Sequence, residues 1–73
     1  GANIAEAYGR FHIKDSIKFL YYSRGSLYET MHWISLMEER DLISKSTHED
    51  FMIQIQDLGI RLNNFITSRK AKL

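Results

Sequence analysis

The sequence predicts an all-α fold, in which antiparallel helices pack as a bundle that further copies of the chain complete. Apolar residues recur at helical spacing over most of the 73 residues, and proline is absent, so nothing forces a helix to break. A chain this short buries only about 60% of its unfolded surface, which leaves a marginal core. Cysteine is absent, so disulfides cannot add the missing stability, and association with other chains remains.

The first predicted segment covers residues 3–10. Ile4, Ala5 and Tyr8 fit one or two turns of helix, and Gly9 is a candidate C-cap. Residues 11–14 contain nothing that forbids helix, so this short segment has two readings. It either ends near Gly9 or continues into the next helix.

The second predicted helix covers residues 15–40, with Asp15 or Ser16 as its N-cap. Gly25 interrupts good helix formers at a cost of about 1 kcal/mol relative to alanine, and beside Ser26 it predicts a close helix crossing. One broad stripe of this helix is apolar at helical spacing, and it consists of Ile17, Leu20, Tyr21, Leu27, Tyr28, Met31, Ile34 and Met37.

A second face of the same helix carries Tyr22, Ser26, Glu29, Trp33 and Met37 at helical spacing. A helix that is apolar on more than one side is usually buried on more than one side. Three helices cannot cover all of this aromatic surface, so we predict that Tyr22, Trp33 and Met37 form a contact between subunits of a homo-oligomer. The alternative is burial inside a single subunit.

The third predicted helix covers residues 47–70 and follows a connection at 41–46. Ser46 or Thr47 can cap it, because acidic residues follow three positions later. Its apolar residues step by four and three, which predicts a buried heptad seam of Phe51, Ile55, Leu58, Leu62 and Phe65. A basic, frayed tail is expected over residues 69–73, and the whole of 1–73 is expected to form one domain.

Several functions find no support in the sequence. No serine sits in a glycine-flanked elbow and cysteine is absent, so we expect no enzyme and no small-molecule substrate. The four glycines never cluster, which argues against a phosphate-binding loop, and no cofactor is expected. No stretch approaches the roughly 20 apolar residues of a membrane helix, so we expect no membrane partner and a cytoplasmic location.

The net charge is only +1, but the charges are unevenly distributed along the chain. Residues 8–26 carry four basic side chains and one acidic one, residues 27–57 carry two basic and seven acidic ones, and residues 58–73 carry four basic ones. On a continuous helix Arg10, Lys14 and Lys18 share one face, with Tyr21 and Tyr22 one turn further on. Cations neutralise phosphates and tyrosine stacks on unpaired bases, so this face is a candidate RNA contact. The alternative is a solvated face that keeps the protein soluble.

Two blocks of the sequence resemble a known family. Residues 2–10 read Ala-Asn-Ile-Ala-Glu-Ala-Tyr-Gly-Arg, and residues 19–29 read Phe-Leu-Tyr-Tyr-Ser-Arg-Gly-Ser-Leu-Tyr-Glu. Both resemble blocks of the bacterial four-helix-bundle proteins encoded in 23S rRNA intervening sequences, although Ala7 stands where that family usually has glycine. The signature positions correspond to Asn3, Glu6, Gly9, Arg10, Gly25, Ser26 and Glu29.

The resemblance implies an up-and-down helical bundle, ring-like homo-oligomers that are often pentamers, a role with RNA or a ribonucleoprotein, and no catalytic residues. Family members are longer and have a helix before the first block. We therefore expect a chain that lacks this first helix, with an open groove that another copy or a swapped helix fills.

Three alternatives concern polar residues and partners. Asn3, Glu6 and Arg10 form either a buried polar cluster that ties helix ends together or a ligand site. Glu29 and His32 fit the Glu-x-x-His motif of di-iron bundles, which needs further carboxylates and a second copy of the motif. A metal-binding bundle is therefore one alternative function, and a module that binds one specific protein is another.

Overall fold

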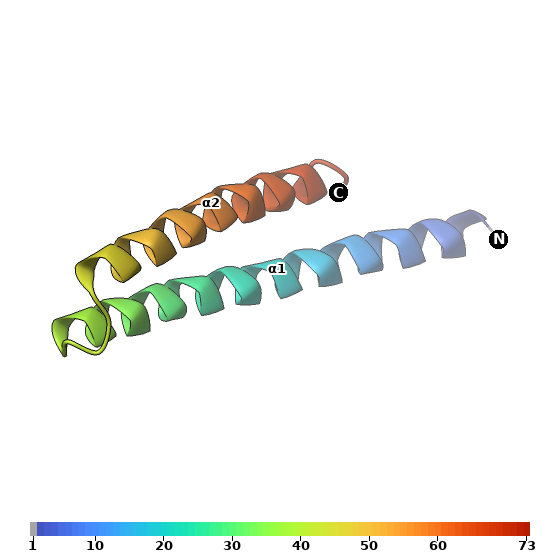
Figure 1. Ribbon diagram of the computed structural model, residues 1–73. Coiled ribbons are helices and arrows are strands. Elements are labelled where there is room, and N and C mark those ends of the chain that lie inside the picture. The colour runs from blue at the N-terminus through green and yellow to red at the C-terminus, as the bar shows by residue number, and fades with distance from the viewer. Residues whose placement is uncertain (1) are drawn as a thin grey trace.

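The computed structural model describes residues 2–73 and shows two antiparallel helices joined by a short turn (Figure 1). Helix α1 spans Ala2–Glu39 and helix α2 spans Lys45–Lys70. No strand occurs in this part of the chain, which confirms the all-α class. The hairpin is long and narrow, with principal extents of 60 × 16 × 10 Å.

The first two predicted helices are one continuous helix. Gly9 does not cap a helix, and neither Asp15 nor Ser16 starts one, because α1 runs without a break through all three positions. None of the glycines within the described residues has a positive φ, so Gly9 and Gly25 keep ordinary helical backbone. The prediction of separate segments over 3–10 and 15–40 was wrong, and the alternative of continuation is what the structure shows.

The turn stops α1 through a Schellman motif. Asp41 adopts a left-handed conformation with φ 59°, which aspartate tolerates better than most residues. The Leu42 N–H donates to the Met37 carbonyl at 2.9 Å, and the Asp41 N–H donates to the Glu38 carbonyl at 3.0 Å. These bonds satisfy carbonyls at the end of α1 and reverse the chain within a few residues.

Helix α2 begins two residues earlier than predicted, and its cap is Ser44 rather than Ser46 or Thr47. The Ser44 backbone is extended, and its Oγ accepts a hydrogen bond from the Thr47 N–H at 3.0 Å. At the other end, α2 includes Arg69 and Lys70, and the Leu73 N–H donates to the Lys70 carbonyl at 3.1 Å. The predicted frayed tail over 69–73 is therefore helix followed by a hydrogen-bonded turn.

The two helices meet along one heptad seam each. On α1 the facing apolar residues are Ile13, Ile17, Leu20, Leu27, Met31 and Ile34, and on α2 they are Met52, Ile55, Leu62 and Ile66. Among the described residues, Ile17, Ile55 and Ile66 are the buried ones, and none of their side chains is completely shielded from solvent. Near the turn, Ser35 Oγ and His48 Nε2 lie 3.2 Å apart and add a polar link between the helices.

Three of the five residues of the seam predicted for α2 point away from α1. Ile55 and Leu62 face α1, but Leu58 is 54% exposed, and Phe51 and Phe65 are exposed as well. On α1, Tyr28 and Met37 of the predicted stripe are also exposed. Each helix carries apolar residues on several sides, and helical periodicity alone cannot say which side meets the neighbour.

The helices are in close contact at Gly59, where an added Cβ would be 3.5 Å from Leu27 Cδ2. A groove of about 360 Å³ opens beside this point, lined by Leu27, Tyr28, Met31, Ile55, Gln56, Gly59, Ile60 and Asn63. The predicted close crossing at Gly25 is not made within the chain, because an added Cβ there meets nothing within 4 Å.

The hairpin leaves much of its surface in solvent. Its accessible area is 5860 Å², whereas a compact protein of 8.6 kDa exposes about 4700 Å². Helix α1 has 38 residues and α2 has 26, so the N-terminal part of α1 extends beyond α2 by about 18 Å (Figure 1). A single copy therefore does not form a closed core.

We predict that the left-handed backbone at Asp41 determines how a substitution at this position changes the free energy of unfolding. Asp41→Ala should lower the free energy of unfolding by about 1 kcal/mol, because a Cβ is strained in this region and alanine has no compensating polar group. Asp41→Gly removes the same charge without the strain and should be at least as stable as the natural chain. Chemical denaturation followed by circular dichroism measures both, and equal losses in the two variants would contradict the assigned turn.

We also predict that Ile55 lies on the side of α2 that packs against α1, so that its substitution affects stability. Ile55→Ala should cost about 2–5 kcal/mol, as other buried large-to-small changes do. Ile53→Ala removes the same atoms from an exposed position and should cost far less. Denaturation midpoints of the two variants compare them directly, and similar losses would mean that α2 is rotated from its described orientation.

Candidate interaction surfaces

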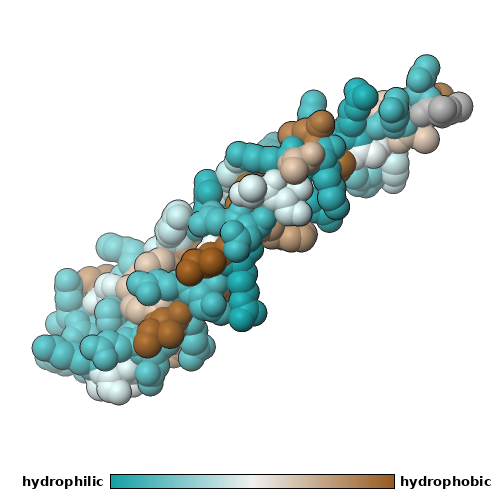
Figure 2. Space-filling view, turned by 90° about the horizontal axis from the view of Figure 1, so that it is seen from above, coloured by the Kyte–Doolittle hydropathy of each residue, from teal (hydrophilic) through white to brown (hydrophobic). Residues whose placement is uncertain are grey.

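The side of α1 that points away from α2 carries a row of exposed large apolar residues, which we call the outer α1 face. Its members recur at helical spacing, and all are exposed: Ile4, Tyr8, Phe11, Phe19, Tyr22, Trp33 and Met37. On the α2 side of the molecule, by contrast, apolar patches stand apart among hydrophilic side chains (Figure 2). The outer α1 face is therefore an extended apolar surface of the hairpin, and exposed apolar surface of this kind marks contact sites.

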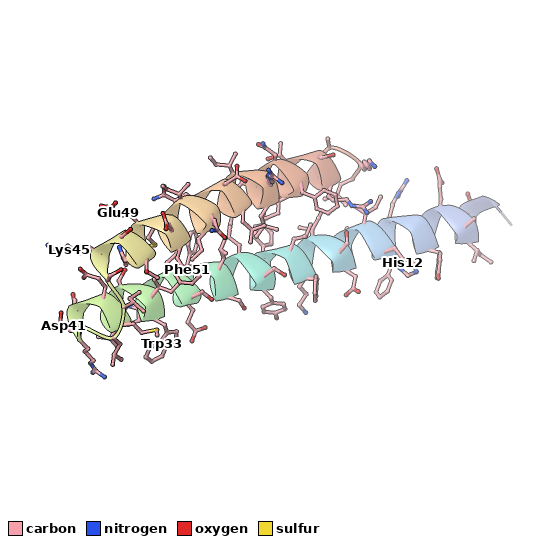
Figure 3. The ribbon with its side chains drawn as sticks, viewed as in Figure 1. His12, Trp33, Asp41, Lys45, Glu49 and Phe51 are labelled. Atoms are coloured by element: carbon pink, nitrogen blue, oxygen red, sulfur yellow. The ribbon has the colours of Figure 1, made fainter. Side chains whose placement is uncertain are left out.

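The three residues predicted to contact another subunit all lie on this face. Tyr22 is 66% exposed, Trp33 is 54% exposed and Met37 is 40% exposed. Trp33 extends from the side of α1 that is remote from α2 (Figure 3). Within the described residues these three side chains are therefore not buried against α2, and the subunit contact stays a prediction.

The predicted RNA contact lies along the N-terminal half of α1, where helix continuity places Arg10, Lys14 and Lys18 at successive turns. Two open hollows border these cations. One of about 270 Å³ is lined by Asp15, Lys18, Phe19 and Tyr22, and one of about 290 Å³ is lined by Phe11, Lys14, Asp15 and Lys18. Asp15 lies in both hollows and offsets part of the positive charge.

The two predicted stacking tyrosines differ in the structure. Tyr22 is exposed, whereas Tyr21 is half-buried and held by two cations. The Arg24 guanidinium carbon lies 4.8 Å from the Tyr21 ring centre, and Lys70 Nζ lies 5.0 Å from it. Arg24 also donates to Asn63 Oδ1 at 3.0 Å, which fixes it between the helices.

Arg24 and Lys70 are candidate binding residues that the sequence analysis did not select. Uneven charge in residues 8–26 and 58–73 was visible in the sequence, but only the hairpin brings the two basic segments together at its open end. The opposite end, around the turn, carries Glu38, Glu39, Asp41, Glu49 and Asp50. Asp41 and Glu49 mark this acidic end in Figure 3. The molecule therefore has a basic open end and an acidic turn end.

The family-like residues at the N-terminus do not form a buried cluster within one chain. Asn3, Glu6 and Arg10 are exposed on the part of α1 that extends beyond α2. In the part of the chain that the structure describes, the one ion pair joins Arg61 to Asp57 at 3.1 Å, so Glu6 and Arg10 are not paired. Gly25, Ser26 and Glu29 are exposed on the opposite side of α1 from α2.

Glu29 and His32, the metal-binding alternative, are exposed one turn apart on α1. No group of three or more metal-binding side chains gathers among residues 2–73. Two ligands from one helix turn do not complete a site, so this alternative depends on a second copy of the chain.

These observations define a class of fold: an all-helical hairpin that exposes apolar and basic surfaces. The comparison with families is more specific. The model of the 23S rRNA-intervening sequence protein family matches residues 1–64, and the chain belongs to this family. The resemblance found in the two sequence blocks is thereby confirmed. No curated protein and no solved structure gives a significant match.

Within the described residues, neither helix contains a stretch that is long and apolar enough to cross a bilayer.

Proposed function

We propose that this protein is a non-enzymatic scaffold, in which several copies assemble into a helical bundle and present basic residues to RNA or a ribonucleoprotein. The observation that carries the proposal is the outer α1 face, where Tyr22 and Trp33 remain exposed in the single hairpin. Aromatic residues are enriched in interfaces, because they bury a large area at low cost in conformational entropy.

The size of the exposed area also supports assembly. One copy exposes about 1200 Å² more than a compact protein of its mass. A stable interface of standard size removes about 800 Å² from each partner. One or two contacts per copy would therefore bring the exposed area to the level of an ordinary globular protein.

The RNA part of the proposal is supported by family membership and by charge. Arg10, Lys14 and Lys18 lie on successive turns of α1, and the hairpin adds Arg24 and Lys70 nearby. A few cations bind RNA weakly, but an assembly repeats them at fixed positions, and linked weak sites bind more tightly than each one alone.

Sedimentation analysis tests the assembly. At micromolar concentration we expect a mass several times the 8.6 kDa of one chain, because only association covers the exposed aromatic residues. A well-folded particle with the mass of one chain would contradict the scaffold.

Fluorescence anisotropy with a labelled single-stranded oligoribonucleotide tests the RNA contact. The double variant Arg10→Glu with Lys14→Glu should weaken binding by about tenfold or more and flatten its dependence on salt, since each lost phosphate contact removes roughly 0.7 from the log–log slope. The control is Arg40→Glu with Lys45→Glu, which changes the net charge equally but at the turn end. Equal losses in the two double variants would mean that binding follows net charge and not the α1 cations.

A further inference from the structure

We propose that Arg24 and Lys70 form a phosphate-binding site between the two helices, beside the ring of Tyr21, and that this site holds a backbone phosphate of RNA. The site rests on the proposed RNA function and adds to it a position that exists only when the hairpin is closed. It follows from two cations on one ring, from the lack of carboxylates around them, and from further cations on the same side of α1.

Two cations from different helices meet at the Tyr21 ring. The Arg24 guanidinium carbon lies 4.8 Å from the centre of this ring, and Lys70 Nζ lies 5.0 Å from it. Tyr21 and Arg24 are half-buried on α1, whereas Lys70 is exposed in the last turn of α2. The face of an aromatic ring attracts cations, so Tyr21 holds close together two groups that repel each other.

No carboxylate compensates these two positive charges. The parts of the helices that meet here lack aspartate and glutamate, since none occurs over residues 16–28 or 58–73. Within the described part of the chain, the one ion pair joins Arg61 to Asp57, so both cations at the ring lack a carboxylate partner. Two unpaired cations at a partly buried place attract an anion, because solvent screens such charges less than fully exposed ones.

The donors at this place suit a phosphate group. Arg24 Nη1 donates to Asn63 Oδ1 at 3.0 Å, which holds the guanidinium across the two helices and leaves its other N–H groups for a ligand. A planar guanidinium binds a phosphate through two parallel hydrogen bonds, and a lysine ammonium adds a compact positive charge. One phosphate can therefore accept hydrogen bonds from α1 and α2 together.

Further cations lie on the same side of α1 as the ring. Lys14 is seven residues, about two turns, before Tyr21, and Arg10 is eleven residues, about three turns, before it. A small anion would occupy only one of these positions. A polymer with a charge on every residue can contact Arg10, Lys14 and the site at Tyr21 together, and each phosphate that it places on a cation releases counter-ions. This row favours an RNA backbone as the ligand.

Substitution of the two cations tests the site. The probe is a labelled oligouridylate without a terminal phosphate, followed by fluorescence anisotropy. Arg24→Gln and Lys70→Gln should each weaken binding by about fivefold. Because both groups contact one phosphate, the double variant should reduce the log–log salt slope by about 0.7, and not by the roughly 1.4 expected for two phosphates.

The matched control removes two positive charges elsewhere. Arg40→Gln with Lys72→Gln changes the net charge equally, with one substitution at the turn and the other in the turn after α2. This control should keep the affinity within about twofold and leave the salt slope unchanged. Circular dichroism of every variant checks that the helices are intact.

A conservative substitution separates the charge of Lys70 from its packing. Lys70→Arg keeps a cation beside Tyr21 and should bind the oligouridylate as tightly as the natural chain. Equal losses in Lys70→Arg and Lys70→Gln would overturn the role of the charge. The oligouridylate should also raise the melting temperature of the natural chain more than that of the double variant, because a ligand that spans both helices binds only the folded hairpin.

The outcomes separate this site from the proposed function. Binding that weakens in the double variant and not in the control supports the site. Binding that ignores both substitutions, or that weakens equally in the control, overturns the site and leaves an RNA contact elsewhere on the chain. Binding only to an oligouridylate with a terminal phosphate overturns the backbone contact. A natural chain without affinity for RNA overturns both the site and the proposed RNA function.

Discussion

Two helices in contact can bury only one side of each other, and both helices of this hairpin are apolar on more than one side. The single seam from Ile13 to Ile34 on α1 therefore leaves aromatic residues in solvent. Several properties of the structure follow from this constraint. It explains why few of the described side chains are buried, why the exposed area is large, and why we propose association.

The hairpin also gives a chain of ordinary composition an uneven distribution of charge on its surface. Chain reversal at Asp41 folds the basic C-terminal segment back onto the basic first half of α1, while the acidic residues of the middle remain at the turn. Tyr21 is then held between Arg24 and Lys70, which come from different helices. A net charge of +1 thus coexists with one basic end and one acidic end.

The chain belongs to the 23S rRNA-intervening sequence protein family, and the structure shows where the family-like residues lie on α1. Of the family-like residues, Asn3, Glu6 and Arg10 lie exposed where α1 extends beyond α2, and Gly25, Ser26 and Glu29 lie exposed on the outer α1 face. Exposure within one chain leaves these residues accessible to other molecules.

The sequence by itself determined the helical class, the family and the aromatic second face of α1, because periodicity and short motifs are local properties of a chain. It also predicted the end of α2 at Lys70. Only the tertiary structure decided that α1 is continuous, that Ser44 caps α2, and that Leu58 points outward while Ile55 points inward. The reason is physical: a helix apolar on three sides satisfies the same periodicity in any rotation, and the partner that it meets selects one.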